Sequence, residues 1–186
     1  MSNQHIVIDN TWYRRLPAAK ERITAGGIVL RQEDQRVYLA LAREDQRVYL
    51  TLAQELALVP GADFPPFVLP KGEVDPDETL EAAARREIHE EVGLSDLQLI
   101  SKLGVLERLS YNKIYWIQTH YFLFTTAQKD GIPTDTQHHN AMWWFPLDDL
   151  PAMLWPEQRQ LIETHKEIFV TVFSNPQRRS GIEVDG

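Results

Sequence analysis

Within residues 72–94, the stretch 76–92 has the pattern of one helix with two very different faces. Because residues three and four apart share a helix face, one side gathers the carboxylates of Glu87, Glu90 and Glu91. A neighbouring stripe is apolar and consists of Ala84, Ile88 and Val92. Such a stripe must be buried against another element, and a sheet is a natural partner. We therefore predict a helix over residues 76–92 that packs on a sheet and ends at Gly93, a residue suited to a C-terminal cap.

The acidic face of this helix calls for a counter-charge, because crowded like charges destabilise a helix. Divalent cations such as Mg²⁺ or Mn²⁺ prefer carboxylate oxygens and keep waters and substrate phosphates as further ligands. Arg86 lies beside Glu90 and can orient a glutamate through a bidentate bond. Gly72 would let backbone amides approach the phosphates or the metal ligands. Glutamate-rich helices are also common as solvated surfaces, so these glutamates alone do not decide for a metal site.

The complete segment resembles the Nudix box, G-x5-E-x7-R-E-U-x-E-E-x-G-U, in which U is an aliphatic residue. Every specified position is filled, by Gly72, Glu78, Arg86, Glu87, Ile88, Glu90, Glu91, Gly93 and Leu94. The resemblance implies an α/β/α sandwich with a mixed β-sheet. It also implies hydrolysis of a nucleoside diphosphate linked to another group. It extends more weakly over residues 22–173, which we expect to form the hydrolase domain.

The resemblance gives each box residue a role. Glu87, Glu90 and Glu91 would bind the metal with Gly72 beside them, while Arg86, Glu90 and Glu91 serve catalysis and Glu78 is structural or an outer ligand. Water would attack one phosphorus while charge on the bridging oxygen is stabilised. The general base stays open between Glu90 or Glu91 in the box and four residues outside it, Glu107, Asp130, Asp135 and His139.

Residues outside the box bear on the substrate. The approach Leu-Pro-Lys-Gly at residues 69–72, and a tyrosine at position 111, resemble dinucleoside polyphosphate hydrolases, which makes such a nucleotide the expected substrate. The predicted substrate-binding residues are Lys71, Tyr111, Lys113 and Trp144. Lysines attract phosphate, and an aromatic ring that stacks on a base contributes about 1–3 kcal/mol. Trp143 and Trp144 should face opposite sides of a strand, so one of them is expected in the core.

Other substrates and functions stay open. ADP-ribose, nucleotide sugars and oxidised nucleoside triphosphates are alternative substrates. A non-catalytic nucleotide-sensing domain is an alternative function, although such domains usually lose box glutamates, and here all are present. An isomerase acting on isopentenyl diphosphate is nearly excluded, because such enzymes rely on a catalytic cysteine and the chain has none.

The rest of the chain predicts a single α/β (α+β) domain. Strands are expected at residues 23–31, 67–69, 97–107, 114–127 and 142–145, and a second helix at 156–173. Residues 33–42 and 44–53 are near-identical copies, EDQRVYLALA and EDQRVYLTLA, whose alternation predicts strands separated by EDQR turns. One copy should join the sheet and the other should extend a hairpin. Residues 1–21 are expected to form an arm anchored by Trp12 and Tyr13, and residues 174–186 a polar tail.

Charge and composition limit the partners. The net charge of -8 gives little long-range attraction to nucleic acid or to a membrane surface, so a small nucleotide is the expected partner. No apolar run is long enough to span a bilayer and no secretory signal is evident, so we expect a cytoplasmic location. A homodimer formed through the extra hairpin is an alternative to a monomer.

Overall fold

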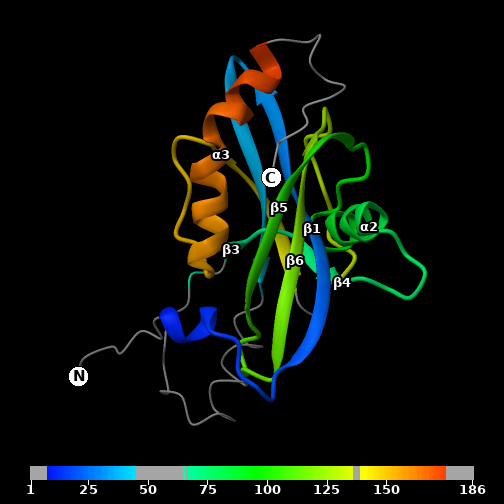
Figure 1. The fold of residues 1–186 in the computed structure, drawn as a ribbon. Helices are drawn as coiled ribbons and strands as arrows, with labels where there is room; N and C mark the ends of the chain where they lie inside the picture. Colours follow the sequence, from blue (N-terminus) through cyan, green and yellow to red (C-terminus); the bar gives the residue numbers. More distant parts are fainter. Residues whose placement is uncertain (1–7, 45–64, 66, 136–138, 175–186) are drawn as a thin grey trace.

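The computed structural model describes residues 8–44, 65, 67–135 and 139–174. In Figure 1, the two α-helices lie on opposite sides of the strands, which form the middle layer. The elements are η1 (Asn10–Tyr13), β1 (Lys20–Glu33), β2 (Arg36–Glu44), β3 (Phe67–Val68), β4 (Lys71–Glu73), α2 (Leu80–Val92), β5 (Gln98–Leu109), β6 (Tyr115–Thr125), β7 (His139–Pro146) and α3 (Pro156–Ser174).

The middle layer is a seven-stranded mixed sheet. Its main path runs β3-β2-β1-β6-β5, while β4 pairs with β1 and β7 pairs with β2. The β1–β6 pair is parallel, and the other pairs of these strands are antiparallel. The predicted α/β/α sandwich with a mixed sheet is therefore confirmed.

Strand β1 is the centre of the fold, because residues 24–31 are buried without interruption. Successive side chains point to opposite faces of a strand. Ala25 and Val29 accordingly join the hydrophobic cluster that includes α2, whereas Ile28 and Leu30 join the cluster that includes α3. A nearly continuous apolar run is typical of a strand covered on both faces.

Two glycines in β1 bring its neighbours unusually close. A Cβ atom on Gly26 would lie 2.3 Å from the carbonyl oxygen of Pro70. One on Gly27 would lie 2.5 Å from the Cδ1 atom of Ile88, on α2. The absence of both side chains lets residue 70 and helix α2 approach the sheet, and this approach places α2 beside β4.

Helix α2 is shorter than predicted, since it begins at Leu80 and not at residue 76. Thr79 is its N-cap, and the Oγ1 atom of Thr79 accepts a hydrogen bond from the backbone N–H of Ala82 at 3.1 Å. Asp77 has a φ of 66°, which is incompatible with a right-handed helix. The predicted end is confirmed: Gly93 has a φ of 71° and its N–H donates to the carbonyl of His89.

The first copy of the duplicated sequence forms the second strand of a β1–β2 hairpin. Asp34 and Gln35 make its turn with φ values of 48° and 65°, the two-residue geometry that matches the twist of paired strands. The first copy therefore joins the sheet as β2. The second copy lies almost entirely within residues 45–64, outside the described residues, so its predicted role in a hairpin stays a prediction.

The other elements differ from prediction mainly at their ends. The second helix, predicted at 156–173, is α3, while the strand predicted at 142–145 is the longer β7. Strand β7 starts at residue 139 because it follows β2 along most of that strand's length. Trp12 is buried and Tyr13 donates from its hydroxyl to Glu157 at 2.6 Å, so both predicted anchors contact the body. Within the described part of the chain, no helix is long and apolar enough to cross a membrane.

Candidate active site

Glu87 lies in a closely fitted position between α2 and β4. Its side chain is mostly buried, with the whole residue 8% exposed. A Cβ atom on Gly72 would lie only 2.1 Å from the carboxylate carbon of Glu87, so the glycine is required for this contact. Burial raises the pKa of Glu87, while the positive charges of Arg86 and Lys71 act in the opposite direction. The box therefore buries a carboxylate against a backbone that has no side chain there.

Arg86 is the hub of the acidic face. It donates through Nε and Nη2 to both carboxylate oxygens of Glu78, at 3.1 and 2.9 Å. Its Nη1 donates to Glu87 at 2.6 Å and to Glu90 at 3.2 Å, and its Nη2 also reaches the carbonyl of Glu73 at 2.8 Å. The bond from Arg86 lowers the pKa of Glu78. One planar guanidinium thus fixes carboxylates of the helix and of the loop before it.

The three helix glutamates differ in how far they reach water. Glu91 is 7% exposed, and its Oε2 accepts a hydrogen bond from the backbone N–H of Lys71 at 3.1 Å. The side chain of Glu90 is 39% exposed. Glu87 and Glu91 are therefore held against residues 71 and 72, while Glu90 faces outward on the same side of α2.

This acidic cluster has more negative than positive charge. Arg86 is hydrogen-bonded to three glutamates, which leaves two formal negative charges unbalanced by it. Among the described residues, no three His, Asp or Glu side chains already stand in the arrangement of a metal site. The donors nevertheless fit a hard divalent cation, since they are carboxylate oxygens on one helix face, and the absence of a side chain on Gly72 lets the carboxylate of Glu87 lie against the backbone there.

The loop between β6 and β7 is docked on the C-terminal end of α2. The backbone N–H groups of Thr134 and Asp135 both donate to the carbonyl of Glu90, at 2.8 and 3.0 Å. A Cβ atom on Gly131 would lie 2.0 Å from the carbonyl oxygen of Val92, and one on Gly93 would lie 2.1 Å from the backbone of Ile132. The loop therefore caps the last turn of the helix that carries the glutamates.

The structure places the candidate bases differently. The docked loop carries Asp130 and Asp135 close to the end of α2. Glu107 lies on β5, where its carboxylate accepts a hydrogen bond from Gln118 at 2.7 Å, and none of its described contacts is with α2. The side chain of His139 lies outside what the structure describes. The assignment of the base stays a prediction.

Of the predicted substrate-binding residues, Lys71 lies at the acidic cluster. It begins β4, directly before Gly72, and its charge acts on Glu87. Trp144 is half-buried against the core, and its Nε1 donates to the carbonyl of Lys129 at 2.6 Å. The adjacent Trp143 is 51% exposed. One tryptophan of the pair, Trp144, therefore packs against the core as expected, although it is only partly buried because β7 lies towards the edge of the sheet, beside β2.

Tyr111 and Lys113 lie in the β5–β6 turn and contact the residue that precedes α3 and the N-terminal segment, respectively. Tyr111 is buried, and its ring meets that of Trp155 edge to face, with centroids 6.5 Å apart. The ammonium of Lys113 donates to the hydroxyl of Thr11 at 2.9 Å and lies 3.9 Å from the ring centroid of Trp12. The described contacts therefore do not bring these two residues to the glutamates, and their binding roles stay predictions.

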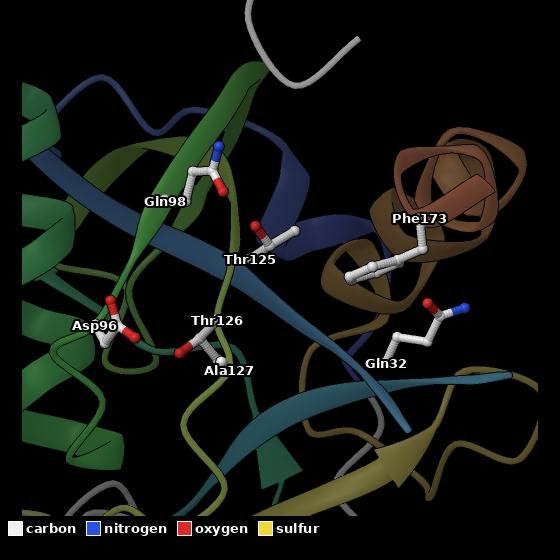
Figure 2. Close-up of a pocket in the computed structure, with 7 residues that line it drawn as sticks. All are labelled: Gln32, Asp96, Gln98, Thr125, Thr126, Ala127 and Phe173. Carbon is white, nitrogen blue, oxygen red and sulfur yellow. The ribbon is translucent and has the colours of Figure 1, made fainter. Parts of the chain in front are cut away.

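A pocket of about 350 Å³ opens elsewhere, between strand ends and the C-terminal part of α3 (Figure 2). Its lining comes from β1, β5, β6 and α3 and the loops beside them: Gln32, Asp96, Gln98, Thr125, Thr126, Ala127 and Phe173. None of these is a predicted site residue, and none belongs to α2. The pocket and the acidic cluster therefore share no residue.

Sequence reasoning missed residues of other elements that contact the end of α2 or the approach to the box. Gly131 and the loop N–H groups give no local signal, because their partners are backbone atoms some forty residues earlier in the chain. Gln158 on α3 was also missed, although it stands three residues before Leu161 on the apolar face of that helix. A polar residue in an apolar stripe was the one available clue.

Comparisons with known proteins agree with this geometry. A family model of the NUDIX domain matches residues 21–165. The chain is 31% identical over 112 residues to a "Putative 8-oxo-dGTP diphosphatase" of Bacillus subtilis (strain 168), covering 60% of this chain and 71% of that protein. It is 33% identical over 87 residues to the "Oxidized purine nucleoside triphosphate hydrolase" of Mus musculus, covering 46% of this chain and 53% of that one.

A solved structure shows the same fold. The crystal structure of a MutT NUDIX hydrolase from Burkholderia pseudomallei matches with a TM-score of 0.55 and 25% identity, over 77% of this chain and 97% of that one. The matched family segment contains the sheet, α2 and the start of α3, so it includes the whole acidic cluster. The chain therefore belongs to the NUDIX family and is a Nudix pyrophosphatase.

Proposed function

We propose that this Nudix hydrolase uses a divalent cation, Mg²⁺ or Mn²⁺, to hydrolyse the phosphoanhydride of an oxidised purine nucleoside triphosphate. The observation that carries the reaction class is the acidic cluster on α2, in which Arg86 joins three glutamates and leaves their charge unbalanced. The substrate class is supported by the names of two sequence relatives, both of which refer to oxidised purine nucleotides.

A dinucleoside polyphosphate is the second candidate substrate. It is favoured by the Leu-Pro-Lys-Gly sequence at residues 69–72. The other support for it was a tyrosine available for stacking at position 111, and that argument is weaker because the ring of Tyr111 is buried against Trp155. We therefore rank the oxidised triphosphate first.

Glu87 and Glu91 would hold the cation, and Glu90, the third predicted ligand, is more exposed on the same helix face. When bound, a divalent cation neutralises phosphate oxygens and makes a coordinated water more acidic. Arg86 keeps the glutamates oriented through its bonds to Glu78 and Glu87, and the ammonium of Lys71 adds attraction for a phosphate.

The reaction balances as a simple hydrolysis. The oxygen of a water molecule forms a bond to one phosphorus, the bond from that phosphorus to the bridging oxygen breaks, and the bridging oxygen leaves with the other product. The proton of the water passes to a base. We assign that base to Glu90, because its side chain is 39% exposed while Glu87 and Glu91 are buried. Asp135 on the docked loop is the alternative.

A panel of nucleotides tests the proposal. The full chain is incubated with Mg²⁺ or Mn²⁺ and 8-oxo-dGTP, dGTP, a dinucleoside tetraphosphate, ADP-ribose or a nucleotide sugar, and the products are identified by mass. We expect the oxidised triphosphate to give the highest kcat/KM, with no turnover in chelator. Product masses also show which bond breaks. A preference for any other compound would replace the proposed substrate, and tight binding without turnover of any of them would favour a nucleotide sensor.

Variants on α2 make the test specific. Glu90→Gln and Glu91→Gln should each lower kcat by about a hundredfold or more, the order of effect seen when one charge-stabilising group is removed from an active site. Glu81→Gln is the matched control, since Glu81 lies on the same helix but pairs with Arg85 outside the acidic cluster. Equal activity of all three variants would contradict the assignment of the cluster to catalysis.

A further inference from the structure

A buried glutamine connects α3 to the loop that precedes the Nudix box. Gln158 is 1% exposed and lies in the first turn of α3. Its Oε1 accepts a hydrogen bond from the backbone N–H of Leu69 at 2.9 Å, and its Nε2 donates to the hydroxyl of Tyr121 at 2.8 Å. A buried amide without partners is costly, so both bonds hold this side chain in one orientation.

The orientation of the amide follows from the chemistry of its partners. A backbone N–H can only donate, so the atom facing Leu69 must be the oxygen of the Gln158 side chain. The nitrogen then faces the hydroxyl of Tyr121, which can accept. Tyr121 is itself buried on β6, within the sheet. The acceptor offered to Leu69 is therefore fixed from behind by a rigid strand.

The residues that follow Leu69 lead directly to the acidic cluster. The carbonyl of Pro70 accepts a hydrogen bond from the N–H of Gly27 at 3.1 Å. The N–H of Lys71 donates to the buried carboxylate of Glu91 at 3.1 Å. Gly72 lies against the carboxylate of Glu87. Four consecutive residues, 69–72, are thus held by α3, by the central strand and by α2 in turn.

We propose that Gln158 is a positioning residue for the hydrolysis. By fixing the N–H of Leu69 it sets the path of residues 69–72, and this path decides where Glu91 and Glu87 are held for a cation. This inference rests on the proposed function, because it takes those two glutamates as cation ligands. Groups that orient ligands from outside the coordination sphere commonly change metal affinity or activity about 10–100-fold when removed.

Manganese binding to the full-length protein tests the inference without relying on activity. The Mn²⁺ dissociation constant is measured by calorimetry for the wild type and for Gln158→Met, which keeps similar volume but offers neither hydrogen bond. Gln160→Met is the matched control, since Gln160 lies on the same helix and is exposed. We expect the dissociation constant to rise roughly 10–100-fold for Gln158→Met and to be unchanged for Gln160→Met.

A second variant separates positioning from general loosening of the fold. Ile162→Val removes one buried methyl group from the packing of α3 but keeps both hydrogen bonds of Gln158. It should lower the urea midpoint of unfolding while Mn²⁺ affinity stays near that of the wild type. The Mn²⁺ concentration for half-maximal hydrolysis should rise with Gln158→Met alone. Equal Mn²⁺ affinity of Gln158→Met and wild type, or equal weakening by Ile162→Val, would overturn the proposal.

The remaining outcomes are also decisive. If Gln158→Met does not fold, Gln158→Asn replaces it, because its shorter side chain withdraws the acceptor from Leu69 and keeps a polar amide. The same results are then expected, and the same results overturn the proposal. If the wild type binds no Mn²⁺, the proposed function fails. If the wild type binds Mn²⁺ and the Gln158 variants bind it equally well, only the role of Gln158 fails.

Discussion

Two arginines, one on each side of the sheet, show how the same side chain serves different purposes. Arg108 is 6% exposed at its side chain and pairs with a single carboxylate, that of Glu157, at 2.7 Å. Its guanidinium also stacks on the ring of Trp155, 3.3 Å from the centroid. Arg86 is 28% exposed at its side chain and is hydrogen-bonded to three glutamates. The Arg108–Glu157 cluster is buried and its charges balance, whereas the Arg86 cluster is partly exposed and acidic.

The difference teaches what charge balance implies. The charges of Arg108 and Glu157 cancel, and Tyr13 donates to the second carboxylate oxygen of Glu157, so this group is complete without a ligand. The Arg86 cluster retains negative charge that Arg86 does not balance and that a further cation would neutralise. Removal of one partner should therefore damage folding in the first cluster and activity in the second.

The largest effect is expected on breaking the balanced pair. Arg108→Met leaves the carboxylate of Glu157 buried without its cation, and this should lower the free energy of unfolding by about 3–5 kcal/mol. Urea denaturation measures it. Arg36→Met is the matched control, because the Arg36–Asp148 pair is exposed and should contribute less than about 1 kcal/mol. A similar small cost for both variants would remove the contrast drawn between the two arginines.

A smaller effect is expected on weakening the acidic cluster while keeping its charge. Arg86→Lys retains one positive charge but loses the two parallel bonds to Glu78, because lysine cannot bind a carboxylate in that way. We expect kcat to fall about 10–100-fold with little change in the unfolding midpoint. Arg85→Lys on the same helix, whose arginine pairs with Glu81, should keep near wild-type activity. Loss of folding and not of kcat in Arg86→Lys would assign both arginines the same structural role.

The smallest effect is expected on the pH dependence of stability and concerns His120, a group that is half-buried without an ion pair among the described residues. Its Nδ1 is buried with no hydrogen-bond partner among the described residues. Burial and, to a lesser degree, the charge of Lys102 lower its pKa from the ordinary value of 6.5. The unfolded chain then binds the proton more readily than the folded protein, so stability is lost as pH falls below about 6.5.

Comparison with His120→Gln isolates this dependence. The wild type should lose stability relative to the variant between pH 7 and about pH 5, by less than about 1 kcal/mol because the half-buried ring is partly screened by water. Urea midpoints at several pH values measure the difference. If the pH profiles of the two proteins are parallel, burial without an opposite charge does not affect the titration of His120. The difference between the Arg86 and Arg108 clusters would then depend on charge pairing alone.

The sequence by itself determined the parts of this protein that depend on local pattern. The glutamate face, the apolar stripe and the glycine cap of α2 follow from helical spacing. The fold class and the family came from the resemblance of the complete segment to the Nudix box, and the family model confirms it. The EDQR turn before β2 was predicted from alternation around short polar segments. These signals are readable because each depends on residues only a few positions apart.

Only the tertiary structure decided which distant groups meet. The start of α2 at Leu80 depends on a cap and a turn whose φ values no periodicity reveals. The docking of residues 131–135 on α2, the burial of Tyr111 and the hydrogen bond that Leu69 donates to Gln158 join positions about forty to ninety residues apart. Such contacts are set by packing of whole elements around β1, and packing leaves no periodic trace in a single sequence.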